Sequence, residues 1–199
     1  NTGGMGAYSP SRLINMELEK KILDKIIRPT LKALHDMKTS YKGFLYAGLM
    51  IVKNEPYLIE YNVRMGDPEC QTILPKLNSD LFDIFIACCT EKLNEVEIKW
   101  HNKKSLCTVL CSNGYPENFK KNVLIKDINK IVLNKNDYCY HASTNEDQGK
   151  IYAVGGRVLN FVSLSDDFLK SRSKTHQLIK SLNWDGGFFR KDIGQKVIN

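Results

Sequence analysis

The first regular pattern of apolar residues along the chain runs from Met16 to Met37 and has the spacing of a helix. Its apolar positions recur every three or four residues, which places them on one helix face: Ile22, Leu23, Ile26, Ile27, Leu31, Leu34 and Met37. Pro29 lies inside the pattern. Because proline has no amide hydrogen and crowds the preceding turn, it should bend or divide this helix.

The next pattern, residues 44–63, predicts two strands. Leu, Ile, Val, Tyr and Phe are dense here, and the segment Lys-Asn-Glu-Pro interrupts them in the middle. Runs of such residues around a turn sequence indicate a β-hairpin. A second helix should follow over LFDIFIACCTEKL, with Ser79 or Asp80 as its N-cap.

The remainder of the chain predicts short strands and one long helix. SLCTVLCSNGYP and DYCYHAST each indicate a strand, and KIYAVGGRVLNFVSLS indicates two strands that form a hairpin or a bulge at Gly155-Gly156. Residues 166–181 have the pattern of an amphipathic helix. Because the composition turns polar around residues 94–102, we expect two domains, residues 1–97 and residues 98–199, of the α+β class.

The composition argues against a nucleic-acid-binding protein and against a membrane-spanning one. The chain has 199 residues and a net charge of +7, but its lysines are scattered rather than clustered, so we expect no nucleic-acid partner. We also expect no membrane span, because no apolar run approaches about eighteen residues. The start, NTGGMGAYSP, looks like the middle of a larger protein. Six cysteines lack metal-site spacing, which favours buried free thiols in a reducing cytoplasm.

Candidate chemistry appears at the end of the predicted hairpin, in YLIEYNVRMGDPEC. Glu60, Asn62 and Arg64 occupy alternate positions, so on a strand they would share one face. A plain solvent-facing strand has the same alternation, and that reading stays open. Carboxylate and amide oxygens suit Mg²⁺, however, and the arginine would lie beside a phosphate bound to the metal.

Two further segments suggest contact with small ligands. The glycines of NTGGMGAYSP allow its backbone to approach a phosphate or carboxylate closely, although an ordinary tight turn would explain them as well. Asp67 and Glu69 flank Pro68 in the sequence GDPE. We expect Asp67 to cap a helix that Pro68 opens, and this does not exclude ligand contact: Asp67 could also accept a substrate ammonium group while Arg64 holds an anion.

Five strings in order, NTGGMGAYSP, GFLYAGLMI, IEYNVRMGDPECQ, GGRVL and FFRKDIG, resemble the glycinamide ribonucleotide synthetase (phosphoribosylamine–glycine ligase) family. The resemblance extends from Asn1 to about Gly194 and corresponds to the C-terminal portion of this ATP-grasp family. It implies the C-terminal lobe of an ATP-grasp fold, an antiparallel sheet with helices, followed by a small β-rich domain. The N-terminal half, which carries the lysines and the lid that hold ATP, would be a missing partner region.

The resemblance also implies a reaction, in which ATP, glycine and 5-phosphoribosylamine give glycinamide ribonucleotide, ADP and phosphate through glycyl phosphate, an early step of purine synthesis. The implied cofactors are ATP and Mg²⁺ or Mn²⁺, and the implied location is the cytoplasm. The string GFLYAGLMI offers no further metal ligand, so water would complete the coordination. The matching residues are Glu60 and Asn62 for the metal; Glu60, Asn62 and Arg64 for the nucleotide; Arg64 and Asp67 for catalysis; and Thr2, Gly3, Gly4, Gly66, Asp67 and Glu69 for the substrates.

Two other functions remain as alternatives. One is another ATP-grasp carboxylate–amine ligase, against which the GDPE string argues because it matches the glycine ligase. The other is a non-catalytic binding module, which would need neither Mg²⁺ nor nucleotide. Under the leading hypothesis, the 199-residue chain alone has no ligase activity.

Overall fold

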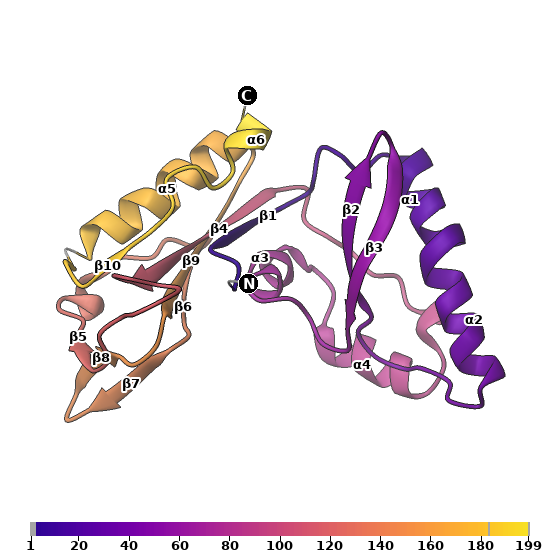
Figure 1. Cartoon of the computed structure of the whole chain (residues 1–199), viewed down its shortest axis with the longest axis horizontal. Coiled ribbons are helices and arrows are strands. Elements are labelled where there is room, and N and C mark those ends of the chain that lie inside the picture. Colours follow the sequence, from indigo (N-terminus) through magenta and orange to yellow (C-terminus); the bar gives the residue numbers. More distant parts are fainter. Residues whose placement is uncertain (1–2, 183, 199) are drawn as a thin grey trace. The chain divides into compact units, whose positions relative to one another are not determined.

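The computed structural model describes residues 3–182 and 184–198, and the contacts between these residues form two compact units (Figure 1). We call residues 1–10, 67–76 and 101–199 the sheet unit, and residues 11–66 and 77–100 the hairpin unit. The α+β class is confirmed, because both units combine helices with antiparallel strands. Within the described residues, no helix has both the length and the apolar character needed to cross a membrane.

The long helical segment of the hairpin unit has three parts. Helix α1 (Met16–Ile22) continues through a π-helical turn, η1 (Leu23–Ile27), into α2 (Arg28–Asp36). The side chain of Asn15 caps α1 by accepting a hydrogen bond from the amide of Leu18 at 2.8 Å. Pro29 lies in the first turn of α2, directly after the π-helical turn. The backbone stays helical through Ile27 and Arg28, so the helix changes from π to α type next to the proline but is not divided there.

The predicted hairpin is also confirmed. Strand β2 (Tyr46–Val52) pairs antiparallel with β3 (Glu55–Asn62) across a turn at Lys53 and Asn54, whose φ angles of 50° and 63° are left-handed. Tyr61 attaches one face of β3 to the helices, since its hydroxyl donates to the carbonyl of Ile26 at 3.2 Å and lies 2.7 Å from the hydroxyl of Thr30. The unit also contains α4 (Leu81–Cys89), capped by Asp80, and the 3₁₀ turn η3 (Leu93–Glu95).

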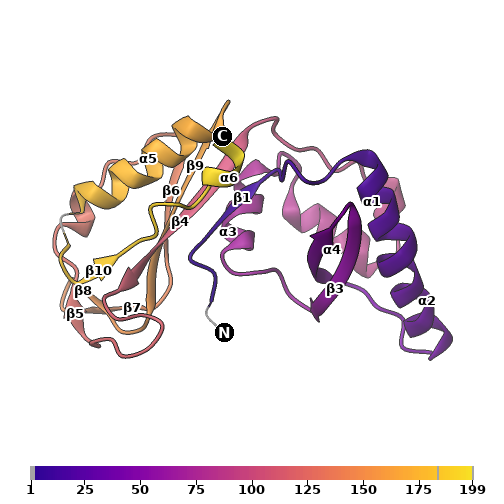
Figure 2. The same cartoon turned by 45° about the horizontal axis from the view of Figure 1, so that its top comes forward.

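The sheet unit is built on five antiparallel strands. The strand order is β1 (Gly6–Ser9), β4 (Lys104–Ser112), β9 (Arg157–Ser165) and β6 (Asp137–His141), and β10 (Gly187–Phe188) also pairs with β4. Figure 2 shows α5 (Phe168–Ser181) lying along one face of this sheet. Short helical segments complete the unit: α3 (Glu69–Ile73), η2 (Leu74–Lys76), η4 (Ile128–Lys130) and α6 (Gln195–Ile198).

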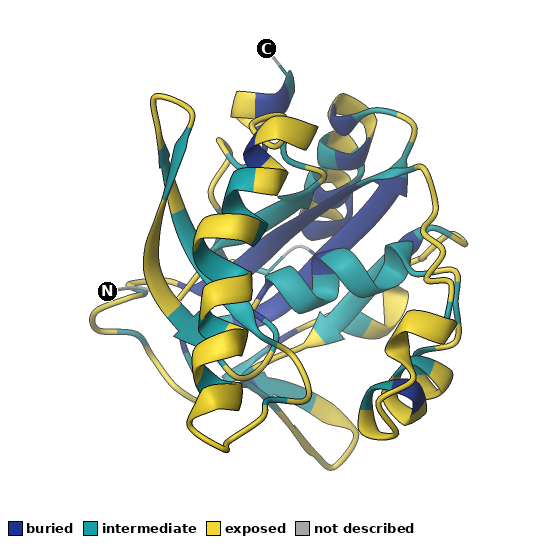
Figure 3. Cartoon of the chain, turned by 90° about the vertical axis from the view of Figure 1, so that its right-hand side faces the viewer, coloured by how far each residue is buried: buried dark blue, intermediate teal, exposed yellow. Residues whose placement is uncertain are grey.

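Alternate side chains of β4 pack against different neighbours. Thr108 points to α5, where its hydroxyl lies 3.0 Å from that of Thr175. Cys107 points to the opposite face and meets Thr72 of α3. The dark blue segments of Figure 3 gather in the long strands of this sheet, because both of its faces are covered.

The glycine pair Gly155-Gly156 does not form the predicted hairpin or bulge. Strand β8 (Lys150–Ala153) lies in a separate three-stranded sheet between β5 (Val123–Leu124) and β7 (Thr144–Asp147). Because β4 and β6 already occupy both edges of β9, β8 cannot pair with it. The prediction of buried thiols holds for Cys107 and Cys111, but it is wrong for Cys89, which is exposed at the end of α4.

The two compact units are interleaved along the sequence. Residues 1–10 belong to the sheet unit because β1 pairs with β4, with Gly6 opposite Thr108 and Ser9 opposite Ser105. The segment 67–76 also belongs there, because α3 packs on β1 and β4. The division into domains 1–97 and 98–199 stays a prediction about the family's domains. It does not coincide with the way the contacts group the chain.

Candidate functional site

Glu60 and Asn62 lie together at the end of β3, on the strand face opposite to the helices. The side-chain amide of Asn62 donates a hydrogen bond to Oε1 of Glu60 at 3.0 Å. Tyr61, between them in sequence, points to the helices instead, because neighbouring residues of a strand face opposite sides. The hairpin therefore presents an acid and an amide side by side on its other face.

The pairing of the two strands explains how Glu60 is accommodated. The register shifts beside Gly48, so that Gly48 pairs with Glu60 while Leu49 pairs with Leu58, and Ile59 is the extra residue of a bulge. A Cβ atom added to Gly48 would lie 3.1 Å from Cγ of Glu60. The lack of a side chain at Gly48 therefore leaves room for the carboxylate arm across the hairpin.

The chemistry of this pair fits Mg²⁺ or Mn²⁺ in part. Both side chains carry oxygen atoms, the ligand type that Mg²⁺ prefers. In the structure Asn62 turns its nitrogen toward Glu60, so shared binding of a cation requires its amide to rotate and present the oxygen. Among the residues that the structure describes, no group of three acidic, histidine or cysteine side chains could hold a metal ion. Water or nucleotide oxygens would have to complete the coordination.

Arg64 does not share this strand face. Strand β3 ends at Asn62, and the guanidinium of Arg64 donates to the neighbouring carbonyl of Met65 at 2.9 Å. The prediction of one face for all three residues is therefore right for Glu60 and Asn62 and wrong for Arg64, because the chain leaves the strand before reaching it. Gly66, the last residue of this segment of the hairpin unit, is buried.

The sheet unit brings together the glycine loop and Asp67. The carboxylate of Asp67 accepts from Nη2 of Arg157 at 2.7 Å through Oδ2 and from the amide of Gln71 at 2.9 Å through Oδ1. Nη1 of Arg157 donates to the carbonyl oxygens of Gly4 at 3.2 Å and of Asp67 at 2.9 Å. The hydroxyl of Tyr115 donates to the carbonyl of Gly3 at 3.3 Å. Two segments far apart in sequence thus meet at one arginine.

These contacts correct the role expected of Asp67 in its local helix. Helix α3 begins at Glu69, its cap position is occupied by Pro68, and no side chain caps it. The carboxylate of Asp67 binds Arg157 and Gln71 instead, so the prediction of Asp67 as a helix cap is wrong. Both carboxylate oxygens already accept a hydrogen bond, although the side chain is 47 % exposed. Thr2, which was also nominated, lies outside the described residues.

Three residues with clear structural roles in these two sites were not nominated from the sequence: Gly48, Gln71 and Arg157. Arg157 lies in GGRVL, one of the five strings that resemble the family. The string alone does not show that this arginine binds Asp67, which is 90 residues away in sequence. Gln71 follows Asp67 by four residues, which is about one turn of a helix, so this hydrogen-bonded pair could have been predicted from the sequence. Gly48 could not, because its role depends on the bulge.

The thiols near these loops are not candidate nucleophiles. Burial raises the pKa of Cys107 far above its usual range, and burial also raises the pKa of Cys111 to about 11. Both thiols therefore stay protonated at neutral pH, and a thiol nucleophile must be deprotonated.

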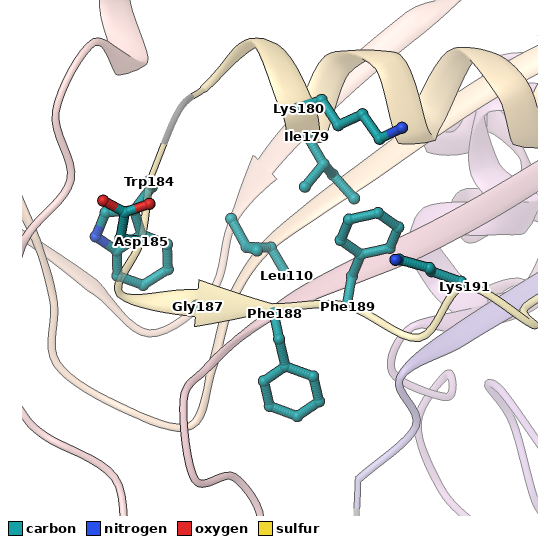
Figure 4. Close-up of a pocket in the computed structure, with 9 residues that line it drawn as sticks. All are labelled: Leu110, Ile179, Lys180, Trp184, Asp185, Gly187, Phe188, Phe189 and Lys191. Carbon is teal, nitrogen blue, oxygen red and sulfur yellow. The ribbon is translucent and has the colours of Figure 1, made fainter.

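A cavity of about 280 Å³ lies elsewhere in the sheet unit (Figure 4). Leu110, Ile179 and Phe189 lie together in its wall, and Phe188 points to the other side of β10. None of the residues nominated from the sequence lines this cavity. It is therefore separate from both candidate sites.

Comparison with known families identifies two consecutive domains of one family. Residues 1–70 match the family model described as phosphoribosylglycinamide synthetase, ATP-grasp (A) domain, and residues 105–196 match the C domain of the same synthetase. Together the two models account for more than half of the chain.

Curated proteins of similar sequence point to the same family as the two models. The chain is 37% identical over 198 residues to a phosphoribosylamine–glycine ligase of Brucella melitensis and 40% identical over 199 residues to that of Vibrio parahaemolyticus, with all of this chain and 46% of each relative covered. The chloroplastic enzyme of Arabidopsis thaliana is 39% identical, with 38% of its length covered. The chain thus spans about half the length of the bacterial relatives.

Two solved structures have a fold similar to that of this chain. A phosphoribosylamine–glycine ligase from Thermotoga maritima matches with a TM-score of 0.78 and 30% identity, over 98% of this chain and 47% of that one. A biotin carboxylase from Campylobacter jejuni matches with a TM-score of 0.59 at 16% identity, over 94% of this chain and 39% of that one, which supports the ATP-grasp fold alone. The two family models, the curated relatives and the Thermotoga structure together show that the chain belongs to the phosphoribosylglycinamide synthetase family.

Proposed function

We propose that the full-length gene product is an ATP-dependent ligase that joins glycine to 5-phosphoribosylamine. The observation that carries the proposal is the Glu60–Asn62 pair, positioned by the bulge at Gly48 in a chain of the synthetase family. Because the chain spans only about half of its relatives, the remaining residues of the active site would lie in the rest of the gene product.

The proposed reaction has two steps. A carboxylate oxygen of glycine attacks the γ-phosphorus of ATP, and ADP leaves, which gives glycyl phosphate. The amine of phosphoribosylamine then attacks the acyl carbon, loses a proton and expels inorganic phosphate. Two anions must meet in the first step, so charge neutralisation and positioning account for most of the rate.

In this scheme the residues of the chain bind and orient the reactants. Glu60 and Asn62 would hold Mg²⁺ or Mn²⁺ on the phosphates of ATP, which the metal neutralises when it is bound. The guanidinium of Arg64 would turn from the carbonyl of Met65 toward the transferring phosphoryl group. Glycine and phosphoribosylamine would bind at Gly3, Gly4, Gly66, Asp67 and Glu69. Thr2 is a further proposed substrate-binding residue.

The alternatives differ in what they require. Another carboxylate–amine ligase of this fold would form ADP with a different acid and without glycine. A binding module would form no ADP. We place the protein in the cytoplasm as part of the proposal, without a nucleic-acid or membrane partner.

The test is ADP formation by the purified full-length gene product with ATP, Mg²⁺, glycine and phosphoribosylamine, in which each substrate is omitted in turn. The proposal predicts that no ADP forms without glycine, that continued turnover also needs phosphoribosylamine to consume the glycyl phosphate, and that the product has the mass of glycinamide ribonucleotide. ADP formation that continues unchanged without glycine would contradict it.

A further inference from the structure

One guanidinium connects three polar groups from two segments that are distant in sequence. Arg157, at the start of β9, donates to the carbonyl of Gly4, to the carbonyl of Asp67 and to the carboxylate of Asp67, at distances between 2.7 and 3.2 Å. Its side chain is 23% exposed, so these bonds are partly shielded from water. All three residues belong to the same compact unit.

The geometry requires an arginine. A planar guanidinium offers donors in a fixed fork, so one side chain can hold a carboxylate and two carbonyl oxygens at once. Lysine has three donors on a single nitrogen and cannot span the same set. The backbone of Gly3 also lies against the guanidinium, because a Cβ atom added there would come within 2.7 Å of Cζ of Arg157. The glycine loop and the arginine therefore fit each other closely.

The sequence predicts substrate-binding residues in both of the segments that Arg157 holds. The carboxylate of Asp67 lies between Arg157 on one side and Gln71 on the other, so its orientation is determined. Arg157 lies in the segment that matches the C domain of the family, while Gly4 and Asp67 lie in the segment that matches the A domain. The C domain thus supplies the group that organises two loops of the A domain.

We propose that Arg157 is a positioning residue that fixes the carboxylate of Asp67 and the backbone of Gly3 and Gly4 for binding the ammonium end of glycine. This inference rests on the proposed ligase function. Arg157 does not contact the substrate in this scheme. It acts through Asp67, whose exposed side offers the remaining acceptor positions for an ammonium group.

The test compares Arg157→Lys, Arg157→Ala and the control Arg190→Ala in the full-length gene product. Arg190 also forms an ion pair with an aspartate of the sheet unit, but its hydrogen bonds go to Asp192 rather than to Gly4 or Asp67. We expect kcat/KM for glycine to fall on the order of 10²-fold in both Arg157 variants, as expected when a positioned group moves by about 1 Å. The KM for glycine should rise while the KM for ATP stays unchanged, and Arg190→Ala should match the wild type.

Two further measurements separate positioning from folding. Added guanidinium ion, at millimolar concentration, should restore part of the glycine kcat/KM of Arg157→Ala, whereas methylammonium should not. A melting curve shows whether each variant is folded. Normal glycine kinetics in folded Arg157→Lys would overturn the proposal, and so would a failure of both variants to fold, since Arg157 would then be a structural residue. If the wild type forms no ADP with glycine, the ligase function itself fails, which is a separate result.

Discussion

The side-chain amide of Asn62 lies 3.0 Å from Oε1 of Glu60, and this pair ends the outward face of β3. The next polar residue of the motif, Arg64, lies beyond the strand and turns to a backbone carbonyl. The hairpin therefore presents a compact pair of oxygen-bearing side chains rather than a row of three. Both side chains carry oxygen atoms, which are the ligand type that Mg²⁺ prefers.

Replacing Asn62 with leucine tests the amide half of the pair. Leucine has a similar size but offers no oxygen, so turnover of the full-length gene product should fall on the order of 10²–10³-fold, the usual cost of losing one oriented electrostatic contact. Steady-state ADP formation measures this. The matched control is Asn145→Leu, an exposed asparagine on β7 that is outside both candidate sites. Equal activity of the two variants would contradict the role of Asn62.

The 199-residue chain alone should show no glycine-dependent ADP formation. It spans about half the length of the relatives it matches, and the resemblance assigns the lysines that hold ATP to the other half. A coupled ADP assay with the isolated chain tests this expectation. Detectable turnover that requires glycine would show that the chain contains a complete active site.

The sequence predicted the local elements well, and it failed where distant segments meet. Periodicity was sufficient for the helical segment that contains Pro29 and for the hairpin of β2 and β3, because both depend on residues close in sequence. The pairing of β1 with β4 could not be predicted, since it joins residues about 100 positions apart. For the same reason the sequence nominated Asp67 but did not reveal its partner Arg157.

Lowering the pH should weaken the attachment of the hairpin to α1 and to the π-helical turn η1. Hydrogen bonds from Lys21 and Lys25 lower the pKa of Glu55 from its ordinary value of 4.5 to about 2. A lowered pKa contributes stability above the ordinary value, and this contribution is lost as the pH falls through the folded-state pKa. The stabilisation should therefore be complete above about pH 4.5 and should disappear toward pH 2.

Thermal unfolding of the 199-residue chain and its Glu55→Gln variant measures this effect. The melting temperature of the variant should be lower at neutral pH, and the difference should shrink as the pH falls from 4.5 toward 2. Glu146→Gln, at an exposed position of β7, serves as the control and should show no such convergence. A difference that is constant with pH would exclude this role of Glu55.

Alkylation should distinguish the cysteines by burial. Cys89 is exposed at the end of α4, whereas Cys107 is fully buried in β4 and burial raises the pKa of its thiol. Because only the accessible thiolate reacts, iodoacetamide at pH about 8 should modify Cys89 well before Cys107 in the native chain. Peptide mass spectrometry over time follows both sites, and Cys89→Ser should remove the fast modification. Equal rates at Cys89 and Cys107 would mean that β4 is accessible.

The most direct test of the central claim is the Mg²⁺ dependence of ADP formation by Glu60→Gln in the full-length gene product, beside Glu95→Gln as the control. Glutamine keeps the shape of Glu60 and removes its charge, so the account predicts weaker Mg²⁺ binding and turnover lower on the order of 10²–10³-fold. Glu95 lies in the exposed turn η3, and its variant should behave as the wild type. Near-normal turnover of Glu60→Gln with an unchanged Mg²⁺ requirement would contradict the account and leave Glu60 and Asn62 as solvent-facing residues of an ordinary strand.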